Sequence, residues 1–108
     1  MSLSINILRG AEQDLNDLKK YLLREFSVGA WQNSYQLIKQ GLAQISSFPE
    51  SGSIPPELEH LGFSNYKQII VGKNRIIYEL NNAAIYVHII CDVRRDMPTL
   101  LNKRLFLS

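Results

Sequence analysis

The spacing of apolar residues changes along this chain, and these changes constrain the fold more than any other feature of the sequence. Residues 3–8 alternate between apolar and polar side chains, which predicts a β-strand ended by Arg9-Gly10. Apolar residues then recur at helical spacing over 11–26 and again over 30–48, with a break at 27–29. The apolar sides of these segments carry Leu3, Ile5 and Ile7, then Leu15, Leu18, Leu22 and Phe26, then Trp31, Ser34, Ile38, Leu42 and Ile45. Two helices joined by so short a loop predict an antiparallel helical hairpin.

The second half of the chain has β-strand patterning. Pro49, Gly52, Pro55 and Pro56 mark an irregular connection that ends near Gly62. Three β-rich segments follow at residues 65–71, 75–80 and 84–91, separated by Gly72-Lys73-Asn74 and by Asn81-Asn82. Asn tolerates the positive φ of a tight turn, and the short connections predict an antiparallel meander.

A final helix is expected from Asp96 to Phe106, with Asp96 as the N-cap and Pro98 in the first turn. The element order is then β-α-α-β-β-β with a short C-terminal helix, an α+β fold in which the helical hairpin packs on an antiparallel sheet. The hairpin covers one face of the sheet. The other face is open to a partner unless the C-terminal helix covers it.

Composition limits the classes of protein that fit. The chain has 108 residues, enough for one domain over 1–108. Its single cysteine, Cys91, excludes an internal disulfide framework and a cysteine metal cluster. No apolar run approaches the roughly 20 residues that span a bilayer, and the first residues do not resemble a secretory signal. No glycine-rich phosphate loop is present. We therefore expect a cytoplasmic domain that uses no metal and no cofactor.

Charge is distributed unevenly. Residues 1–60 carry five Lys or Arg and seven Asp or Glu, whereas residues 61–108 carry seven Lys or Arg and three Asp or Glu. A basic second half suggests an acidic partner, either nucleic acid or an acidic protein segment. The density of cations is modest, so a solvated basic face is an equally simple interpretation.

Several short motifs of this chain resemble the motifs of one protein family, and they occur in the same order along the sequence. Ala11-Glu12-Gln13-Asp14-Leu15 is similar to an A-x-x-D-L helix opening, and Pro49 to Gly52 to a P-x-x-G helix exit. Asn74-Arg75-Ile76-Ile77-Tyr78-Glu79 is similar to Y-R-I-I-Y-E, and Asp92-Val93-Arg94-Arg95-Asp96 to H-x-R-R-D. Together these motifs, which span nearly the whole chain, resemble the RelE/ParE superfamily of bacterial type II toxin–antitoxin modules.

The resemblance implies a toxin that forms a hetero-oligomeric complex with a cognate antitoxin. It also implies one of two activities, because RelE-like members cut mRNA on the ribosome whereas ParE-like members inhibit DNA gyrase without nuclease chemistry. The two branches share one fold, so only the residues of the functional site can distinguish them.

Cleavage of RNA by its own 2′-OH needs a base, an acid and cations for the developing phosphorane charge. RelE-like enzymes use lysines, arginines and a C-terminal tyrosine for these roles. The resemblance implies that Lys67, Arg75 and Arg95 stand at the positions of the catalytic cations. Ile69 stands where a second strand cation is expected, and Leu101 stands near the tyrosine position. Leucine cannot transfer a proton. His88 is the remaining candidate for acid–base work, although a lone strand histidine is more often structural.

The incomplete acid–base set favours the ParE-like branch: a gyrase inhibitor that is not an enzyme, with the ribosome-dependent endoribonuclease as the alternative. The apolar C-terminal tail either packs across the open sheet face or is offered to a partner. The target-binding candidates are Arg75, Arg94, Arg95, Leu101, Lys103, Arg104 and Leu105.

Overall fold

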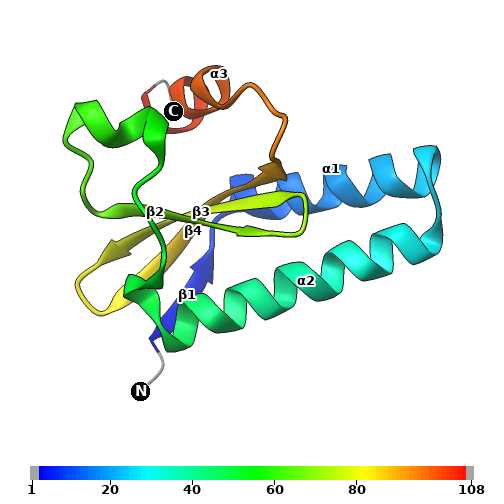
Figure 1. Ribbon diagram of the computed structural model, residues 1–108, viewed down its shortest axis with the longest axis horizontal. Coiled ribbons are helices and arrows are strands. Elements are labelled where there is room, and N and C mark those ends of the chain that lie inside the picture. The colour runs from blue at the N-terminus through cyan, green and yellow to red at the C-terminus, as the bar shows by residue number, and fades with distance from the viewer. Residues whose placement is uncertain (1–2, 107–108) are drawn as a thin grey trace.

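One four-stranded sheet with helices on both sides organises the chain (Figure 1). The computed structural model describes residues 3–106. Its elements are β1 (Ser4–Ile7), α1 (Arg9–Glu25), α2 (Val28–Ser47), η1 (Pro49–Ser51), η2 (Pro56–Leu61), β2 (Tyr66–Val71), β3 (Asn74–Asn81), β4 (Ala84–Asp92), α3 (Met97–Leu101) and η3 (Asn102–Phe106). The expected order of elements is confirmed, and so is the α+β class. Within residues 3–106, no helix is long and apolar enough to cross a membrane.

The sheet is mixed, whereas the sequence predicted an antiparallel one. The strand order is β1-β4-β3-β2, with β2, β3 and β4 antiparallel as expected. The first strand instead lies parallel to β4, from Ser4 opposite Ala84 to Ile7 opposite Val87. Meander turns specify only neighbouring strands. The helical hairpin and the strands β2 and β3 lie between β1 and its partner β4 in the chain, so local patterning left their relative direction open.

The boundaries of the helical hairpin differ from those expected. Arg9 and Gly10 form the first turn of α1 and do not end a strand. The turn to α2 is short, since Val28 already belongs to α2 and the Ser27 hydroxyl caps that helix by accepting from the Ala30 amide at 3.0 Å. Phe26 terminates α1 and is 64% exposed, so its predicted place in the apolar stripe is wrong.

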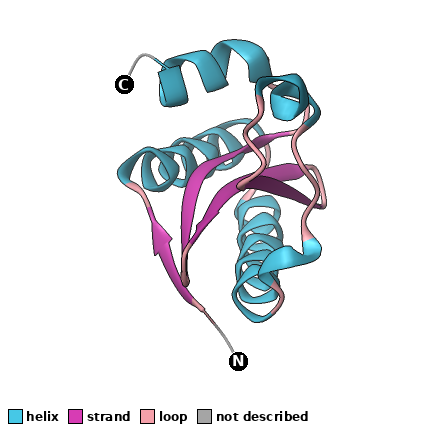
Figure 2. Ribbon diagram, turned by 90° about the vertical axis from the view of Figure 1, so that its left-hand side faces the viewer, coloured by secondary structure: helices cyan, strands magenta, loops and turns pink. Residues whose placement is uncertain are grey.

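Two apolar clusters lie on opposite faces of the sheet. The first lies between the sheet and the hairpin and includes Ile38, Ile45, Ile76 and Val87. The second lies under η2 and the C-terminal helix. Its members are Leu58, Ile77, Ile89, Cys91, Met97, Leu100 and Leu101. Figure 2 shows the C-terminal helical segment on the side of the sheet away from α2. The tail therefore covers the face that the hairpin leaves open.

A β-bulge at His88 changes which face the second half of β4 presents. Ile77 of β3 pairs with Ile89 while the next residue, Tyr78, pairs with Val87, so His88 is an extra residue. Val87 consequently belongs to the first cluster and Ile89 to the second. Simple strand alternation would put Val87 and Ile89 on the same face, and the bulge places them on opposite faces.

Shortening Leu101 tests whether the tail is part of the core. Leu101 is 2% exposed, so Leu101→Ala should lower the free energy of unfolding by about 2–5 kcal/mol, from lost burial and a residual cavity. Leu23→Ala is the matched control, because Leu23 is 41% exposed and its truncation should cost less than about 1 kcal/mol. Urea denaturation of both variants measures the difference. Equal costs would mean that the tail does not pack as described.

Candidate functional site

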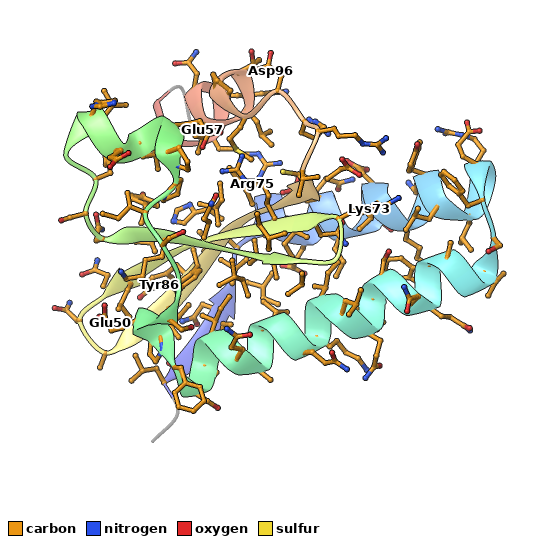
Figure 3. The ribbon with its side chains drawn as sticks, viewed as in Figure 1. Glu50, Glu57, Lys73, Arg75, Tyr86 and Asp96 are labelled. Atoms are coloured by element: carbon orange, nitrogen blue, oxygen red, sulfur yellow. The ribbon has the colours of Figure 1, made fainter. Side chains whose placement is uncertain are left out.

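Arg75, a candidate for both target binding and catalysis, is held in a buried ion pair. It lies on β3 and is 8% exposed. Its Nη1 and Nη2 donate to the two Glu57 carboxylate oxygens at 3.0 and 2.9 Å, and Nη2 also donates to the Gln68 amide oxygen. Figure 3 shows Glu57 and Arg75 side by side beneath the C-terminal helix. The hydrogen bonds from Arg75 hold the pKa of Glu57 below its ordinary value. A guanidinium engaged in this way presents no open fork to a phosphate.

The side chains of Lys67 and Arg75 do not lie close together. On β2, Lys67 pairs in register with Tyr78, whereas Arg75 pairs with Ile70, and residues of opposite parity lie on opposite faces of a sheet. The Lys67 ammonium lies 3.5 Å from a carboxylate oxygen of Glu50, beside η1. Two of the catalytic cations expected from the sequence, Lys67 and Arg75, therefore lie on opposite faces of the sheet.

His88 forms an acid–base pair with Glu79. Its Nε2 lies 2.8 Å from Glu79 Oε1, and its ring lies 5.2 Å from the Tyr66 ring, centroid to centroid. Burial, followed by the charge of Glu79, raises the pKa of Tyr66. Asn65 donates to the other Glu79 oxygen at 3.3 Å. The bulge thus gathers a histidine, a carboxylate and a phenol on the face that carries the second cluster.

Arg104 has a structural partner that the sequence did not reveal. Its guanidinium donates to both Asp14 carboxylate oxygens and to the His88 carbonyl oxygen at 2.9 Å. Asp14 also accepts from the Ile90 amide at 3.0 Å. These hydrogen bonds engage the Arg104 guanidinium within the fold, whereas the sequence suggested it as a target-binding residue. The only sequence signal for Asp14 was its place in the A-x-x-D-L motif.

The tail candidates divide into covered and exposed residues. Leu101 is buried in the second cluster and Leu105 packs against it, so the structure does not offer these two side chains as an open surface. Lys103, Arg94 and Arg95 are exposed, as that role requires. Arg94 pairs with Asp92 at 2.9 Å, and its hydrogen bonds lower the pKa of Asp92. Of the predicted site residues, Arg94 and Arg95 are brought together after β4.

A metal site does not appear in the part of the chain that the structure describes. Among residues 3–106, no group of three His, Cys, Asp or Glu side chains is placed to hold a metal ion. Cys91 is buried and burial raises the pKa of its thiol to about 11, so it is poorly suited to act as a nucleophile.

Comparisons with known proteins were made for the sequence and for the fold. Residues 5–97 match the family model described as the ParE toxin of the type II toxin–antitoxin system parDE. A structure of the chromosomal ParDE system from P. aeruginosa superposes with a TM-score of 0.68 at 12% identity, covering 84% of this chain and 96% of the other. A free mutant form of the E. coli toxin RelE gives a TM-score of 0.61 at 12% identity, covering 98% and 100%. No curated protein sequence matches significantly.

The Glu57–Arg75 pair predicts an acid-sensitive contribution to stability. Because the pKa of Glu57 is lowered in the folded state, the pair stabilises the fold above the ordinary value of 4.5, and this stabilisation is lost as the pH falls below it. Glu57→Gln should cost about 1.5–3 kcal/mol near neutral pH and should reduce the difference in stability between about pH 6 and about pH 3.

Urea titrations at both pH values measure this effect. Asp92 and Asp96, whose pKa values are also lowered, remain in both proteins and give a common background. Glu59→Gln, an exposed substitution in the same turn, should change stability by less than about 0.5 kcal/mol. An unchanged pH dependence in Glu57→Gln would contradict the assignment.

Proposed function

The chain belongs to the ParE toxin family of type II toxin–antitoxin systems, and from that membership we propose that it inhibits DNA gyrase and is neutralised by a cognate antitoxin. Inhibition would follow from binding and not from catalysis by this chain. Both the gyrase target and the toxin–antitoxin complex are in the cytoplasm in this proposal, and the complex is hetero-oligomeric.

The observation that carries the proposal is the separation of the groups that RNA cleavage would need. Lys67 lies on the opposite face of the sheet from Arg75, and Glu57 occupies the guanidinium of Arg75. Leu101, near the position of the expected tyrosine, is buried and cannot transfer a proton. Stabilisation of a phosphorane requires cations aimed at one point, and these residues do not supply it.

A contact surface for the target remains at the exposed cations. Arg94 and Arg95 leave β4 in succession, and Lys103 lies on the outer side of the tail. Arg94 is held by Asp92, whereas the side chain of Arg95 has no hydrogen-bond or ion-pair partner among residues 3–106. An unpaired exposed arginine is well suited to recognise a carboxylate or phosphate on a partner.

A second candidate function, the ribosome-dependent mRNA endoribonuclease, rests on the pairing of His88 with Glu79. A histidine and a carboxylate in contact are a familiar acid–base combination. Arg104, which donates to the His88 carbonyl oxygen, is already paired with Asp14 and so is not free to bind a phosphate beside this pair.

Pulse labelling after induction separates the two functions. A gyrase inhibitor should stop thymidine incorporation before amino-acid incorporation, and the purified chain should inhibit supercoiling by purified gyrase. If protein synthesis stopped first while DNA synthesis continued, the gyrase proposal would be wrong.

His88→Gln adds an independent check on catalysis. The substitution removes the titratable ring and keeps a polar side chain of similar reach, so a gyrase inhibitor should keep its potency within about twofold, whereas a nuclease that uses His88 should lose about 100-fold or more in cleavage rate. Gyrase supercoiling and ribosome-dependent mRNA cleavage are the two measurements. Circular dichroism of the variant checks that it folds.

A further inference from the structure

The edge of β4 beyond the end of β1 is covered by side chains where a neighbouring strand would be expected. β1 pairs with β4 only as far as Ile7 opposite Val87, and the Leu8 amide donates to the Val87 carbonyl oxygen at 3.1 Å. β4 itself continues to Asp92. Ile90 is 1% exposed, so its backbone amide needs a hydrogen-bond partner inside the protein.

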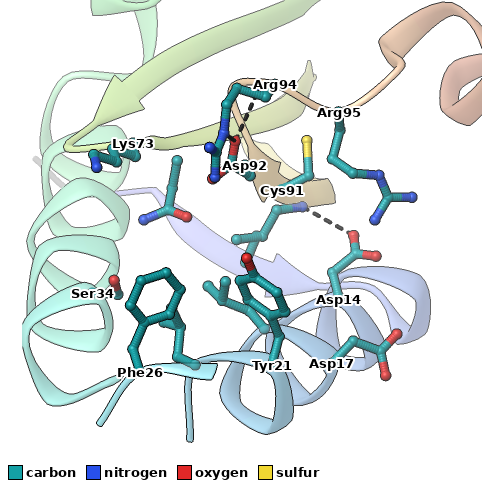
Figure 4. Close-up of a pocket in the computed structure, with 14 residues that line it drawn as sticks. Asp14, Asp17, Tyr21, Phe26, Ser34, Lys73, Cys91, Asp92, Arg94 and Arg95 are labelled. Atoms are coloured by element: carbon teal, nitrogen blue, oxygen red, sulfur yellow. Dashed lines mark hydrogen bonds and ion pairs between the residues drawn. The ribbon is translucent and has the colours of Figure 1, made fainter. Parts of the chain in front are cut away.

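The Asp14–Arg104 pair supplies the hydrogen bonds of one strand residue. In a parallel ladder, one residue donates to a carbonyl oxygen of the neighbouring strand and accepts from the amide two residues farther on. Here Arg104 Nη1 donates to the His88 carbonyl oxygen at 2.9 Å, and Asp14 Oδ2 accepts from the Ile90 amide at 3.0 Å. Figure 4 shows the Asp14 carboxylate directed at the end of β4, with its bond to the β4 backbone dashed. The guanidinium thus replaces a strand N–H and the carboxylate replaces a strand C=O.

The winding of the tail changes just before Arg104. In α3, Met97, Leu100 and Leu101 are buried and anchor residues 97–101 in the second cluster. Residues 102–106 wind as a π-helix, a rare conformation that occurs mostly as single turns. Within this last turn, residues 102 and 103 are exposed, whereas residues 104 and 105 are half-buried. The contacts of residues 104 and 105 with the body of the protein therefore hold the turn in place.

Gly10 leaves room for the guanidinium beside α1. The three heavy atoms nearest to a Cβ at Gly10 would all belong to the Arg104 guanidinium, with Nη1 the closest at 2.8 Å. Gly10 lies in the first turn of α1 and does not have a positive φ, so alanine suits the helix itself. A methyl group at this position would move the guanidinium while leaving both charges in the protein.

We propose that Gly10, Asp14 and Arg104 form a latch, which closes the β4 edge and holds the last turn of the tail at Asn102–Phe106. The latch opens without unfolding of the domain, because residues 97–101 keep their own anchors and β4 stays paired with β3. Opening releases one helical turn and leaves one amide and one carbonyl group of β4 without these partners. Such a local transition changes hydrogen exchange at a few amides of a folded protein.

Hydrogen exchange of backbone amides, followed by NMR, tests the latch. Arg104→Met removes the guanidinium and keeps an unbranched side chain, whereas Gly10→Ala displaces the guanidinium and keeps both charges. In both variants the amides of Ile90 and Leu105 should lose at least about tenfold in protection relative to the amides of β3. Arg94→Met is the matched control, because it makes the same change in an exposed pair with Asp92. It should leave the protection of these two amides within about twofold of wild type.

Two outcomes would overturn the latch. The first is wild-type protection of Ile90 and Leu105 in both variants, which would mean that the pair does not hold the edge or the last turn. The second is an equal loss of protection at these amides and throughout β3, which would mean that the pair opens only when the whole domain unfolds. Neither outcome depends on what the protein binds.

Lys103 lies in the turn that the latch holds, next to Arg104. On the proposed function, in which Lys103 contacts the target, Arg104 is therefore a positioning residue. Lys103→Met should raise the concentration that half-inhibits gyrase supercoiling by about fivefold in the wild-type background, but by less than about twofold when Arg104→Met is already present. Equal losses in the two backgrounds would refute the positioning role. If the wild-type chain did not inhibit gyrase, the proposed function would fail, and hydrogen exchange would still decide the latch.

Discussion

A small sheet that is apolar on both faces has to be covered twice, and this requirement determines how the whole chain is used. Ile76 and Ile77 are adjacent in β3, point to opposite faces and are both fully buried. The helical hairpin is large enough to cover only one of these faces. The other face would expose apolar side chains to water if it were left uncovered. Two short elements, η2 and the C-terminal helical segment, cover it. The tail is therefore committed to the core.

Two ion pairs hold these short covers in place. Glu57 fastens η2 to Arg75 in the centre of the sheet, and Arg104 fastens the tail to Asp14 on α1. The second pair also completes the edge of β4 beyond the end of β1, where Asp14 accepts from the Ile90 amide and Arg104 donates to the His88 carbonyl oxygen. A Cβ at Gly10 would lie 2.8 Å from Arg104 Nη1, so a side chain there would displace the guanidinium from its place beside Asp14. A buried arginine with a fixed carboxylate partner stabilises only while both remain, which favours keeping both in structural roles.

The positions of the main elements could be predicted from local sequence pattern, whereas the contacts between distant parts of the chain could not. Periodicity located the four strands, α1 and α2, whereas η1 and η2 lie in a segment that was expected to be irregular. The capping role of Asp96 was also predicted, and its side chain accepts from the Thr99 amide. The roles of Asp14 and Arg104 depend on a contact across 90 residues, and no local rule reports it. The bulge at His88 escaped prediction for a related reason, because it is set by pairing with β3 and by the Arg104 contact, not by the composition of β4. Residues were thus assigned to the correct elements more reliably than to the correct faces.

The face of the sheet on which each side chain lies matters more for function than the fold does. One fold can support either catalysis or inhibition by contact. A nuclease needs its cations free and directed at one phosphate, whereas here the cations nearest the centre of the sheet are consumed in closing the core. The cations that remain available stand where the strands end, next to an apolar pocket. Removing a charge from that rim would leave the core unaltered, while freeing Arg75 or Arg104 for chemistry would expose the face that each of them helps to seal. Exposed residues at the strand ends can therefore change without loss of core stability, whereas recruiting Arg75 or Arg104 to chemistry would cost part of that stability.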